Sequence, residues 1–227
     1  MKPICIIPAR KGSKRIKDKN IKLFNGIPII QRVIDIAKDS KIFSKIVVST
    51  DSKKIANLAV DRGAEVPFLR KKALSDDNTQ ITPVLIDAIK NIHSQKVDCH
   101  FCIFPTAVLT KSNDLKKAYD FFKTSKFDSL IAVSEYDHSP IKALKINKYN
   151  ISRKWPSLNT KTKKTQDIEM LVHDSGSFYI FDTNIFLNKR NLITKNTTFY
   201  KLDYFRSFDI DTIQDFRFAE QIYKFTN

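Results

Sequence analysis

Short apolar runs alternate along the first half of the chain with longer segments in which apolar residues recur every three or four positions. The runs have the length of buried strands, and the longer segments have the spacing of amphipathic helices. Strands are predicted over 4–7, 45–50, 65–69, 98–104 and 129–134. Helices are predicted from residue 28, around 55–59, over 81–92 and over 112–122. This alternation predicts an α/β fold with a mainly parallel sheet and helices on both of its faces.

The alternation breaks after residue 134. A strand is predicted over 142–146, and the stretch 147–168 is polar with weak periodicity. We interpret about 140–170 as an excursion from the main sheet that forms a small lid or a dimerisation arm. The remaining predicted elements are a strand over 177–181, one or two closing strands over 200–210 and a helix over 212–225. Because the chain has no internal repeat and no low-complexity tract, we predict a single domain over 1–227.

The charge of the chain, a formal +16 over 227 residues, would by itself suggest a nucleic-acid partner. The cations are mostly lysines spread along the whole sequence, however, and no block of five or more occurs. Scattered lysines are typical of a solvated surface, so we expect no nucleic-acid partner. No apolar run reaches the roughly 18 residues that span a bilayer, and no signal peptide precedes Lys2, so we expect a cytoplasmic protein without a membrane partner.

The three cysteines, an odd number, argue against a disulfide framework. Cys99 and Cys102 have the spacing of a metal-binding pair, but they lie within a predicted strand. Residues three apart on a strand point to opposite faces, so these two thiols could not share a metal ion. We interpret both as core residues.

A loop rich in cations follows the first predicted strand. Its sequence over 9–15 is ARKGSKR. Open α/β sheets bind ligands where strands deliver their carboxyl ends, and cations with free backbone N–H groups suit phosphate. The loop has one glycine and matches neither a dinucleotide-binding fingerprint nor a P-loop. From chemistry alone, it is either a phosphate cradle that uses Arg10, Lys14 and Lys19 or a solvated basic turn.

Two carboxylates close together near the end of the chain form a second candidate. Asp209 and Asp211 flank Ile210, and on an extended segment residues i and i+2 share a face. Oxygen ligands of this kind suit Mg²⁺, especially beside substrate phosphates. The alternative is that Asp211 caps the last helix, because Gln214 stands three residues later as in a capping box. Both interpretations remain open from the residues alone.

A third candidate combines polar and aromatic residues just before the strand predicted over 177–181. It consists of QD at 166–167 and HDSGSFY at 173–179. No nucleophile elbow is present, which argues against a hydrolase triad. The segment is either a polar turn packed under aromatic rings or a wall that contacts a polyhydroxylated substrate.

Residues 6–15, IIPARKGSKR, together with Lys19 and Asn20, resemble the opening motif of the CMP-sugar synthetases, which are cytidylyltransferases that activate sialic-acid-like sugars. The resemblance extends over nearly the full length of the chain. Further matching segments, in the expected order, are 49–51, 63–64, 67–70, 74–76, 105–106 and 209–211. The HDSGSFY segment is most similar to HDAGQFY in the branch of the family that acts on pseudaminic acid.

This resemblance implies a nucleotide-diphospho-sugar transferase-like (Rossmann-like) fold and a reaction between CTP and a nine-carbon 2-keto sugar acid that yields the CMP-sugar and pyrophosphate. It implies Mg²⁺ held by Asp209 and Asp211, catalysis by Arg10, Lys19 and Asp211, and a homodimer. The residues that it assigns to CTP are Arg10, Gly12, Ser13, Lys14, Lys19, Asn20, Arg70 and Ser75. The residues that it assigns to the sugar are Gln166, Asp167, His173, Asp174, Phe178 and Tyr179.

The chain departs from the family pattern in two places. KKT at 163–165 precedes Gln166 where many relatives have arginine, and a lysine supplies charge without the fork that binds a carboxylate. AVLT at 107–110 replaces a sequence of the Ser-Pro-Leu-Arg type. The same reaction on N-acetylneuraminic or legionaminic acid, or more distantly KDO, is the alternative within the family. A basic nucleic-acid-binding module that shares the fold is the alternative from another class.

Overall fold

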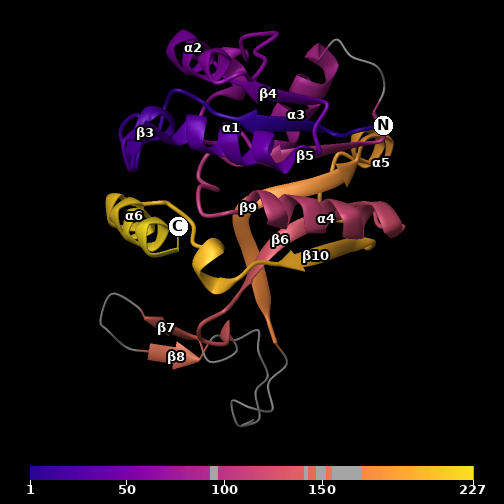
Figure 1. Cartoon of the computed structure of the whole chain (residues 1–227). Helices are drawn as coiled ribbons and strands as arrows, with labels where there is room; N and C mark the ends of the chain where they lie inside the picture. The colour runs from indigo at the N-terminus through magenta and orange to yellow at the C-terminus, as the bar shows by residue number, and fades with distance from the viewer. Residues whose placement is uncertain (93–96, 141–142, 147–151, 155–169, 227) are drawn as a thin grey trace.

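The computed structural model describes residues 1–92, 97–140, 143–146, 152–154 and 170–226. A six-stranded sheet in the order β10-β6-β9-β5-β1-β4 forms the centre (Figure 1). Its strands are β1 (Ile4–Pro8), β4 (Lys45–Ser49), β5 (Cys99–Ile103), β6 (Ser129–Glu135), β9 (Val172–Asp182) and β10 (Thr197–Lys201). Three neighbouring pairs are parallel, whereas β9 runs antiparallel to both β5 and β6. The predicted mainly parallel α/β sheet is confirmed.

Helices cover both faces of the sheet, as predicted. They are α1 (Ile29–Ser40), α2 (Lys53–Asp61), α3 (Ile81–Asn91), α4 (Ser112–Thr124), α5 (Thr183–Lys189) and α6 (Ile213–Thr226). Apolar residues of α1, α2, α4 and α6 join one core cluster, and those of α3 and α5 join the other. In β1, Cys5 and Ile7 contribute to the first cluster, and Ile4 and Ile6 to the second. The strand is a continuous apolar run because both of its faces are buried.

The cysteine prediction also holds. Cys99 lies in the first core cluster and Cys102 in the second, so the two thiols are on opposite faces of β5. All three cysteines are buried and free. Burial is the main cause that raises the pKa of the Cys99 thiol to about 12, which leaves it protonated and unreactive at neutral pH.

The strand predicted near residue 144 lies outside the main sheet. β7 (Leu144–Ile146) pairs with β8 (Ser152–Lys154) in a separate two-stranded antiparallel sheet. Figure 1 shows this small sheet well apart from the six-stranded one, beyond the ends of β6 and β9. The polar stretch at 155–169 lies outside the described residues.

Three predicted elements differ from those observed. Residues 65–69 form isolated bridges instead of a strand: Glu65 pairs with Val47 of β4, and Leu69 pairs with Thr50 just after it. Pro67 between them has no N–H to donate to a ladder. Residues 200–210 do not form closing strands throughout, because β10 ends at Lys201 and the 3₁₀ helix η5 (Tyr204–Arg206) follows. β9 begins earlier than predicted, so the HDSGSFY segment lies within the strand.

A short hairpin precedes α1 and was not predicted. β2 (Leu23–Phe24) and β3 (Ile27–Pro28) are joined by Asn25 and Gly26, both with positive φ (46° and 83°). Asparagine–glycine is the sequence that favours such a turn, so the signal was present. The Asn25 backbone N–H donates to Glu220 of α6 at 2.9 Å, and Phe24 packs edge-on against Phe216. The hairpin therefore connects the end of the cationic loop to the last helix.

Candidate active site

A cleft of about 530 Å³ lies at the carboxyl ends of β1, β4 and β5. Three segments line it: the cationic loop after β1, the stretch between residues 70 and 84, and the turn at 104–106. The predicted CTP residues that line it are Arg10, Gly12, Ser13, Lys14, Lys19, Asn20 and Arg70. Ser75 is outside this lining, and its hydroxyl donates to the Lys71 carbonyl at 3.1 Å.

Hydrogen bonds made by its own backbone groups hold the cationic loop in place. The Ala9 N–H donates to the Ser49 carbonyl at 2.9 Å, and the Lys11 N–H donates to the Asp51 carboxylate at 2.7 Å. The Asn20 side-chain amide donates to the Arg10 carbonyl at 2.8 Å. The loop is thus fixed through its backbone, while the side chains of Arg10, Lys14 and Arg15 line the cleft.

Arg70 is a cation with little contact with solvent, at 6% exposure. Its guanidinium donates to the Ser49 carbonyl at 2.5 Å and to the Leu74 carbonyl at 3.4 Å. Its Nε–H has no hydrogen-bond partner among the described residues. Burial is the main cause that lowers the pKa of Arg70 from its ordinary value. A buried donor without a partner in a cleft wall is suited to an oxygen of a bound ligand.

The cationic loop and the carboxylate pair come together in space although they are about 190 residues apart. The Lys19 ammonium donates to the Ile210 carbonyl at 2.9 Å, between the two aspartates. Arg15 forms an ion pair with Asp211 at 2.5 Å. Arg15 and Lys19 line the cleft, so Asp209 and Asp211 lie at that end of it without being part of the lining. Figure 1 shows α6, the helix that follows the pair, on the same side of the molecule as β3.

The carboxylates and the lysine alter one another's protonation. Burial, followed by repulsion from Asp211, raises the pKa of Asp209. Burial lowers the pKa of Lys19, and attraction to Asp209 and Asp211 opposes that shift. The Asp209 carboxylate accepts a hydrogen bond from the adjacent Ile210 N–H at 2.8 Å. Part of Asp209 is exposed to solvent, and a carboxylate with a raised pKa and so few donors favours the approach of a cation.

The helix after the pair is capped by Thr212, so the interpretation of Asp211 as the cap is wrong. The Thr212 hydroxyl accepts from the Asp215 N–H at 3.2 Å, and the Asp215 carboxylate accepts from the Thr212 N–H at 2.6 Å. This is a reciprocal capping box. Asp215 also accepts from the Asp211 N–H at 3.1 Å, which fixes the Asp211 backbone and leaves its carboxylate to Arg15.

The HDSGSFY segment of β9 lies directly beside Asp209. Gly176 has φ of +61°, and a Cβ built there would come within 3.3 Å of the Asp209 carboxylate. Asp174 accepts from the Gly176 N–H at 2.9 Å and from the Tyr179 hydroxyl. Burial, then the bond to Asp174, raises the pKa of Tyr179 well above its ordinary value.

The other predicted sugar residues lie in different surroundings. His173 is exposed and its ring contacts that of Tyr136, with centroids 4.8 Å apart. Phe178 is fully buried in the first core cluster, where its ring stacks with that of Phe101. Gln166 and Asp167 lie outside the described residues.

The donor set at Asp209 and Asp211 fits Mg²⁺. Both residues supply hard oxygen ligands, and the second Asp209 oxygen has no hydrogen-bond partner among the described residues. No group of three or more metal-ligating side chains occurs in the described part of the chain. Mg²⁺ commonly binds through one or two carboxylates and completes its shell with water and phosphate oxygens, so two protein ligands are sufficient.

Asp77 is a site residue that sequence reasoning did not single out. Its two carboxylate oxygens pair with Arg10 at 2.5 Å and with Lys14 at 2.6 Å, across the cleft from its own segment. The polar run from Ser75 to Asn78 was visible in the sequence as a loop. No local pattern indicated that one of its acids would contact the cationic loop.

A cationic cleft at the carboxyl ends of parallel strands, with a carboxylate pair at one end, defines an α/β protein built to bind a phosphate-bearing ligand. The model of the cytidylyltransferase family matches residues 4–227. The chain therefore belongs to the cytidylyltransferase family and is a nucleotidyltransferase.

Individual relatives and a solved structure agree with this membership. The chain is 37% identical to the pseudaminic acid cytidylyltransferase of Campylobacter jejuni, over 99% of this chain and 97% of that protein. It is 32% identical to an N-acylneuraminate cytidylyltransferase of Streptococcus agalactiae, over 95% of this chain and 52% of that protein. Its fold matches a CMP:2-keto-3-deoxy-manno-octonic acid synthetase complexed with CTP, with a TM-score of 0.75, 13% identity and full coverage of both chains.

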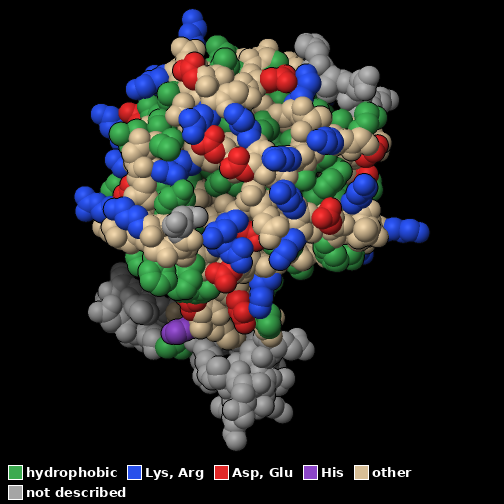
Figure 2. All heavy atoms as spheres, viewed as in Figure 1, with side chains coloured by type: hydrophobic (Ala, Val, Ile, Leu, Met, Phe, Trp, Pro, Cys, Tyr) green, Lys and Arg blue, Asp and Glu red, His purple; other side chains and the backbone are tan. Residues whose placement is uncertain are grey.

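Two further observations concern partners. Among the described helices, none is long and apolar enough to cross a membrane. Figure 2 shows lysine and arginine side chains scattered over one face of the molecule among acidic ones, without a continuous basic stripe on that face. A continuous stripe would be expected of a surface that tracks a nucleic-acid backbone.

Proposed function

We propose that this chain is a Mg²⁺-dependent enzyme that transfers CMP from CTP to pseudaminic acid. The observation that carries the reaction is the contact between Lys19 and the Ile210 carbonyl, because it joins a phosphate-binding loop to a metal-binding carboxylate pair. The 37% identity to a pseudaminic acid cytidylyltransferase over nearly the whole of both chains supports the choice of sugar.

In the proposed reaction the anomeric hydroxyl oxygen of the sugar acid attacks the α-phosphorus of CTP. A new bond forms between the sugar oxygen and phosphorus, and the hydroxyl proton passes to solvent. The bond from the α-phosphorus to the bridging oxygen breaks, and pyrophosphate leaves with the bridging oxygen. Such a transfer depends mainly on positioning and on neutralising charge. Arg10, Lys14 and Lys19 would neutralise the triphosphate, and Arg10 can do so with two parallel hydrogen bonds.

The remaining predicted CTP residues would orient the nucleotide. Gly12 and Ser13 leave room and backbone donors in the loop, and neither a neighbour nor a strained φ constrains Gly12. Asn20 and Arg70 would contact the cytosine and ribose, and the free Nε–H of Arg70 is the donor best suited to this. Ser75 would act through its backbone, because its carbonyl lies 3.4 Å from Arg10 and its hydroxyl is already engaged.

Mg²⁺ bound by Asp209 and Asp211 would supply charge neutralisation at the phosphates. The sugar would lie beside Gly176, with Asp174, His173 and Tyr179 at its edge, since this part of β9 touches Asp209. Phe178 would support that wall from the core.

We also propose that the enzyme is a cytoplasmic homodimer and that the excursion at about 140–170 is its dimerisation arm, which the separate β7–β8 sheet supports.

The test is pyrophosphate release with CTP and a panel of purified sugar acids: pseudaminic, N-acetylneuraminic, legionaminic and the eight-carbon KDO. We expect the highest kcat/KM with pseudaminic acid, no release without a sugar acid, and loss of release in EDTA that added Mg²⁺ restores. UTP in place of CTP serves as the matched control, because it carries the same triphosphate.

A higher kcat/KM with another acid would contradict the substrate, and release that persists in EDTA would contradict the cofactor. The nucleic-acid alternative predicts no turnover with any acid. It also predicts filter binding of DNA or RNA that weakens steeply as salt rises.

A further inference from the structure

Asp77 contacts the phosphate-binding cations in the structure. One carboxylate oxygen lies 2.5 Å from the Arg10 guanidinium and the other lies 2.6 Å from the Lys14 ammonium. All three residues line the same cleft. The carboxylate therefore makes with these cations the kind of two-pronged contact that a phosphate group would make.

The turn that carries Asp77 is shaped by its neighbour. The Asp76 carboxylate accepts hydrogen bonds from the Asn78 N–H at 2.9 Å, from the Thr79 N–H at 2.7 Å and from the Thr79 hydroxyl at 2.7 Å. Asp76 thus folds the turn back on itself, and Asp77 extends toward the cationic loop. The two adjacent acids have the same charge and both line the cleft, but they have different partners.

The contact between Asp77 and the cations is accessible to solvent. The side chains of Arg10 and Asp77 are each 31% exposed, and that of Lys14 is 83% exposed. Ion pairs in contact with water contribute little net stability, on the order of 0–1 kcal/mol. A polyphosphate can therefore displace the carboxylate, but at a cost that lowers its apparent affinity.

We propose that Asp77 competes with substrate and product phosphates for Arg10 and Lys14, and thereby weakens the binding of both CTP and pyrophosphate. This inference rests on the proposed function, in which the same cleft holds the triphosphate. The competition applies to every ligand whose phosphates reach the two cations and to no ligand without phosphates. Its use would be to keep the cleft from retaining the pyrophosphate product.

The experiment is isothermal titration of wild type, Asp77→Asn, Asp77→Glu and Asp76→Asn with CTP, inorganic pyrophosphate and cytidine. The buffer contains Mg²⁺ and moderate salt, and sugar acid is omitted so that no turnover occurs. Asp77→Asn should lower the Kd of CTP and of pyrophosphate by about fivefold, the factor that corresponds to a weak exposed pair. Cytidine binding should be unchanged, and Asp77→Glu should lie close to wild type.

Asp76→Asn is the matched control, because it removes one charge from the same turn without removing a partner of the cations. Tightening by Asp76→Asn equal to that by Asp77→Asn would mean a general charge effect and would overturn the inference. Unchanged or weaker pyrophosphate binding in Asp77→Asn would overturn it too. Wild type that binds pyrophosphate but not CTP would instead contradict the proposed function, and pyrophosphate would still decide the role of Asp77.

Discussion

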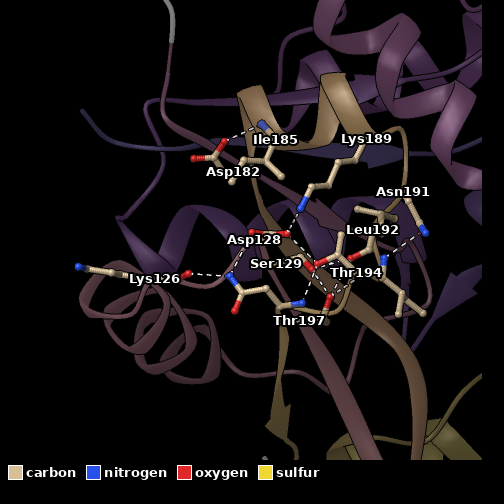
Figure 3. Close-up of polar contacts among 12 residues, drawn as sticks. Lys126, Asp128, Ser129, Asp182, Ile185, Lys189, Asn191, Leu192, Thr194 and Thr197 are labelled. Atoms are coloured by element: carbon tan, nitrogen blue, oxygen red, sulfur yellow. Dashed lines mark hydrogen bonds and ion pairs between the residues drawn. The ribbon is translucent and has the colours of Figure 1, made fainter.

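Two carboxylate centres, at Asp128 and at Asp209, differ in how many hydrogen-bond donors the fold gives them. Figure 3 shows the first, in which Asp128 accepts from Lys189 at 2.7 Å, from Thr194 at 2.7 Å and from the Asn196 amide at 3.1 Å. These donors, the Lys189 ammonium foremost, lower the pKa of Asp128 to about 2. The centre joins the start of β6 to α5 and to the turn before β10.

Asp209 is the opposite case. It accepts from the adjacent Ile210 N–H, and burial and the charge of Asp211 raise its pKa. The fold supplies Asp128 with every donor it needs and supplies Asp209 with far fewer. A carboxylate rich in donors stabilises the fold, whereas a solvent-accessible carboxylate short of donors is available to a ligand. The number of donors, rather than the residue type, separates the structural acid from the functional one.

The largest expected effect comes from neutralising the carboxylate that has few donors. Asp209→Asn should reduce turnover by about 10²- to 10³-fold, because it removes one of the two proposed metal ligands. In EDTA at pH 7 the same variant should melt at a higher temperature than wild type. A carboxylate with a raised folded pKa destabilises the fold while it is ionised, so this gain should vanish at pH values below the unfolded pKa of about 3.9.

Pyrophosphate release and calorimetric melting at pH 7 and pH 3.5 would measure both effects. Asp211→Asn is the companion variant and should also lose turnover. Full activity in Asp209→Asn, or a lower melting temperature in EDTA, would remove the distinction between the two centres.

An intermediate effect is expected at the contact that holds the functional segment in place. Arg206 donates to Asp114 at 2.8 Å, and Asp114 is 3% exposed and also accepts from the Lys111 N–H at the start of α4. Arg206→Met should lower kcat by about tenfold and raise the Mg²⁺ concentration needed for half-maximal rate, with little change in the KM for CTP, as for residues that orient metal ligands. Stability should fall by about 1–3 kcal/mol because Asp114 loses its charged partner.

Arg206→Lys keeps the positive charge, so the Mg²⁺ concentration for half-maximal rate should return most of the way to the wild-type value. Arg217→Met is the control: it changes an exposed position of α6 and should behave like wild type. Steady-state kinetics across Mg²⁺ concentrations, with Mn²⁺ binding followed by electron paramagnetic resonance, separates positioning from stability. Loss of stability with an unchanged Mg²⁺ response would make the pair purely structural.

The smallest effect on turnover is expected at Asp128, the carboxylate that has several hydrogen-bond donors. Asp128→Asn should lower the free energy of unfolding at pH 7 by about 1 kcal/mol: the Asp128 side chain is only 9% exposed, but asparagine keeps an oxygen that accepts hydrogen bonds, and the Lys189 partner is 54% exposed. Turnover per folded molecule should stay at the wild-type value. A carboxylate with a depressed pKa stabilises the fold above the unfolded pKa, so the difference from wild type should shrink as pH falls from about 4 to about 2.

Urea unfolding of both proteins from pH 7 to pH 3 would measure this difference. A pH-independent difference would indicate that the amide disturbs packing rather than charge. Reduced turnover without reduced stability would place Asp128 with the functional acids.

Most of the strands, the cationic loop and the carboxylate pair could be predicted because each depends on a pattern of residues close together in the sequence. β1 is one apolar run, α1 has an apolar stripe, and Asp209 and Asp211 stand two positions apart. Local patterns also predicted that Cys99 and Cys102 would point to opposite faces. In these cases the relevant physics acts within a few residues.

What could not be predicted depends on contacts between distant segments. The antiparallel pairing of β9 with β5 joins strands far apart in the sequence, and Asp77 meets Arg10 across 67 positions. Two other misassignments were local. Thr212 caps the last helix in place of Asp211, and Asp215, three positions after Thr212, accepts from both backbone N–H groups. Pro67 stands within the stretch 65–69 and interrupts its ladder, so the signal against a regular strand was present in the sequence.

Gly176 has a consequence for anyone who wishes to redesign the sugar preference of this enzyme. Any larger residue there would be strained by the left-handed backbone and would press its Cβ against the Asp209 carboxylate. Mutagenesis libraries along β9 should therefore hold this position constant, because in the proposed site a change there would affect the metal ligand Asp209 and the sugar wall together, so that the two could not be tuned separately.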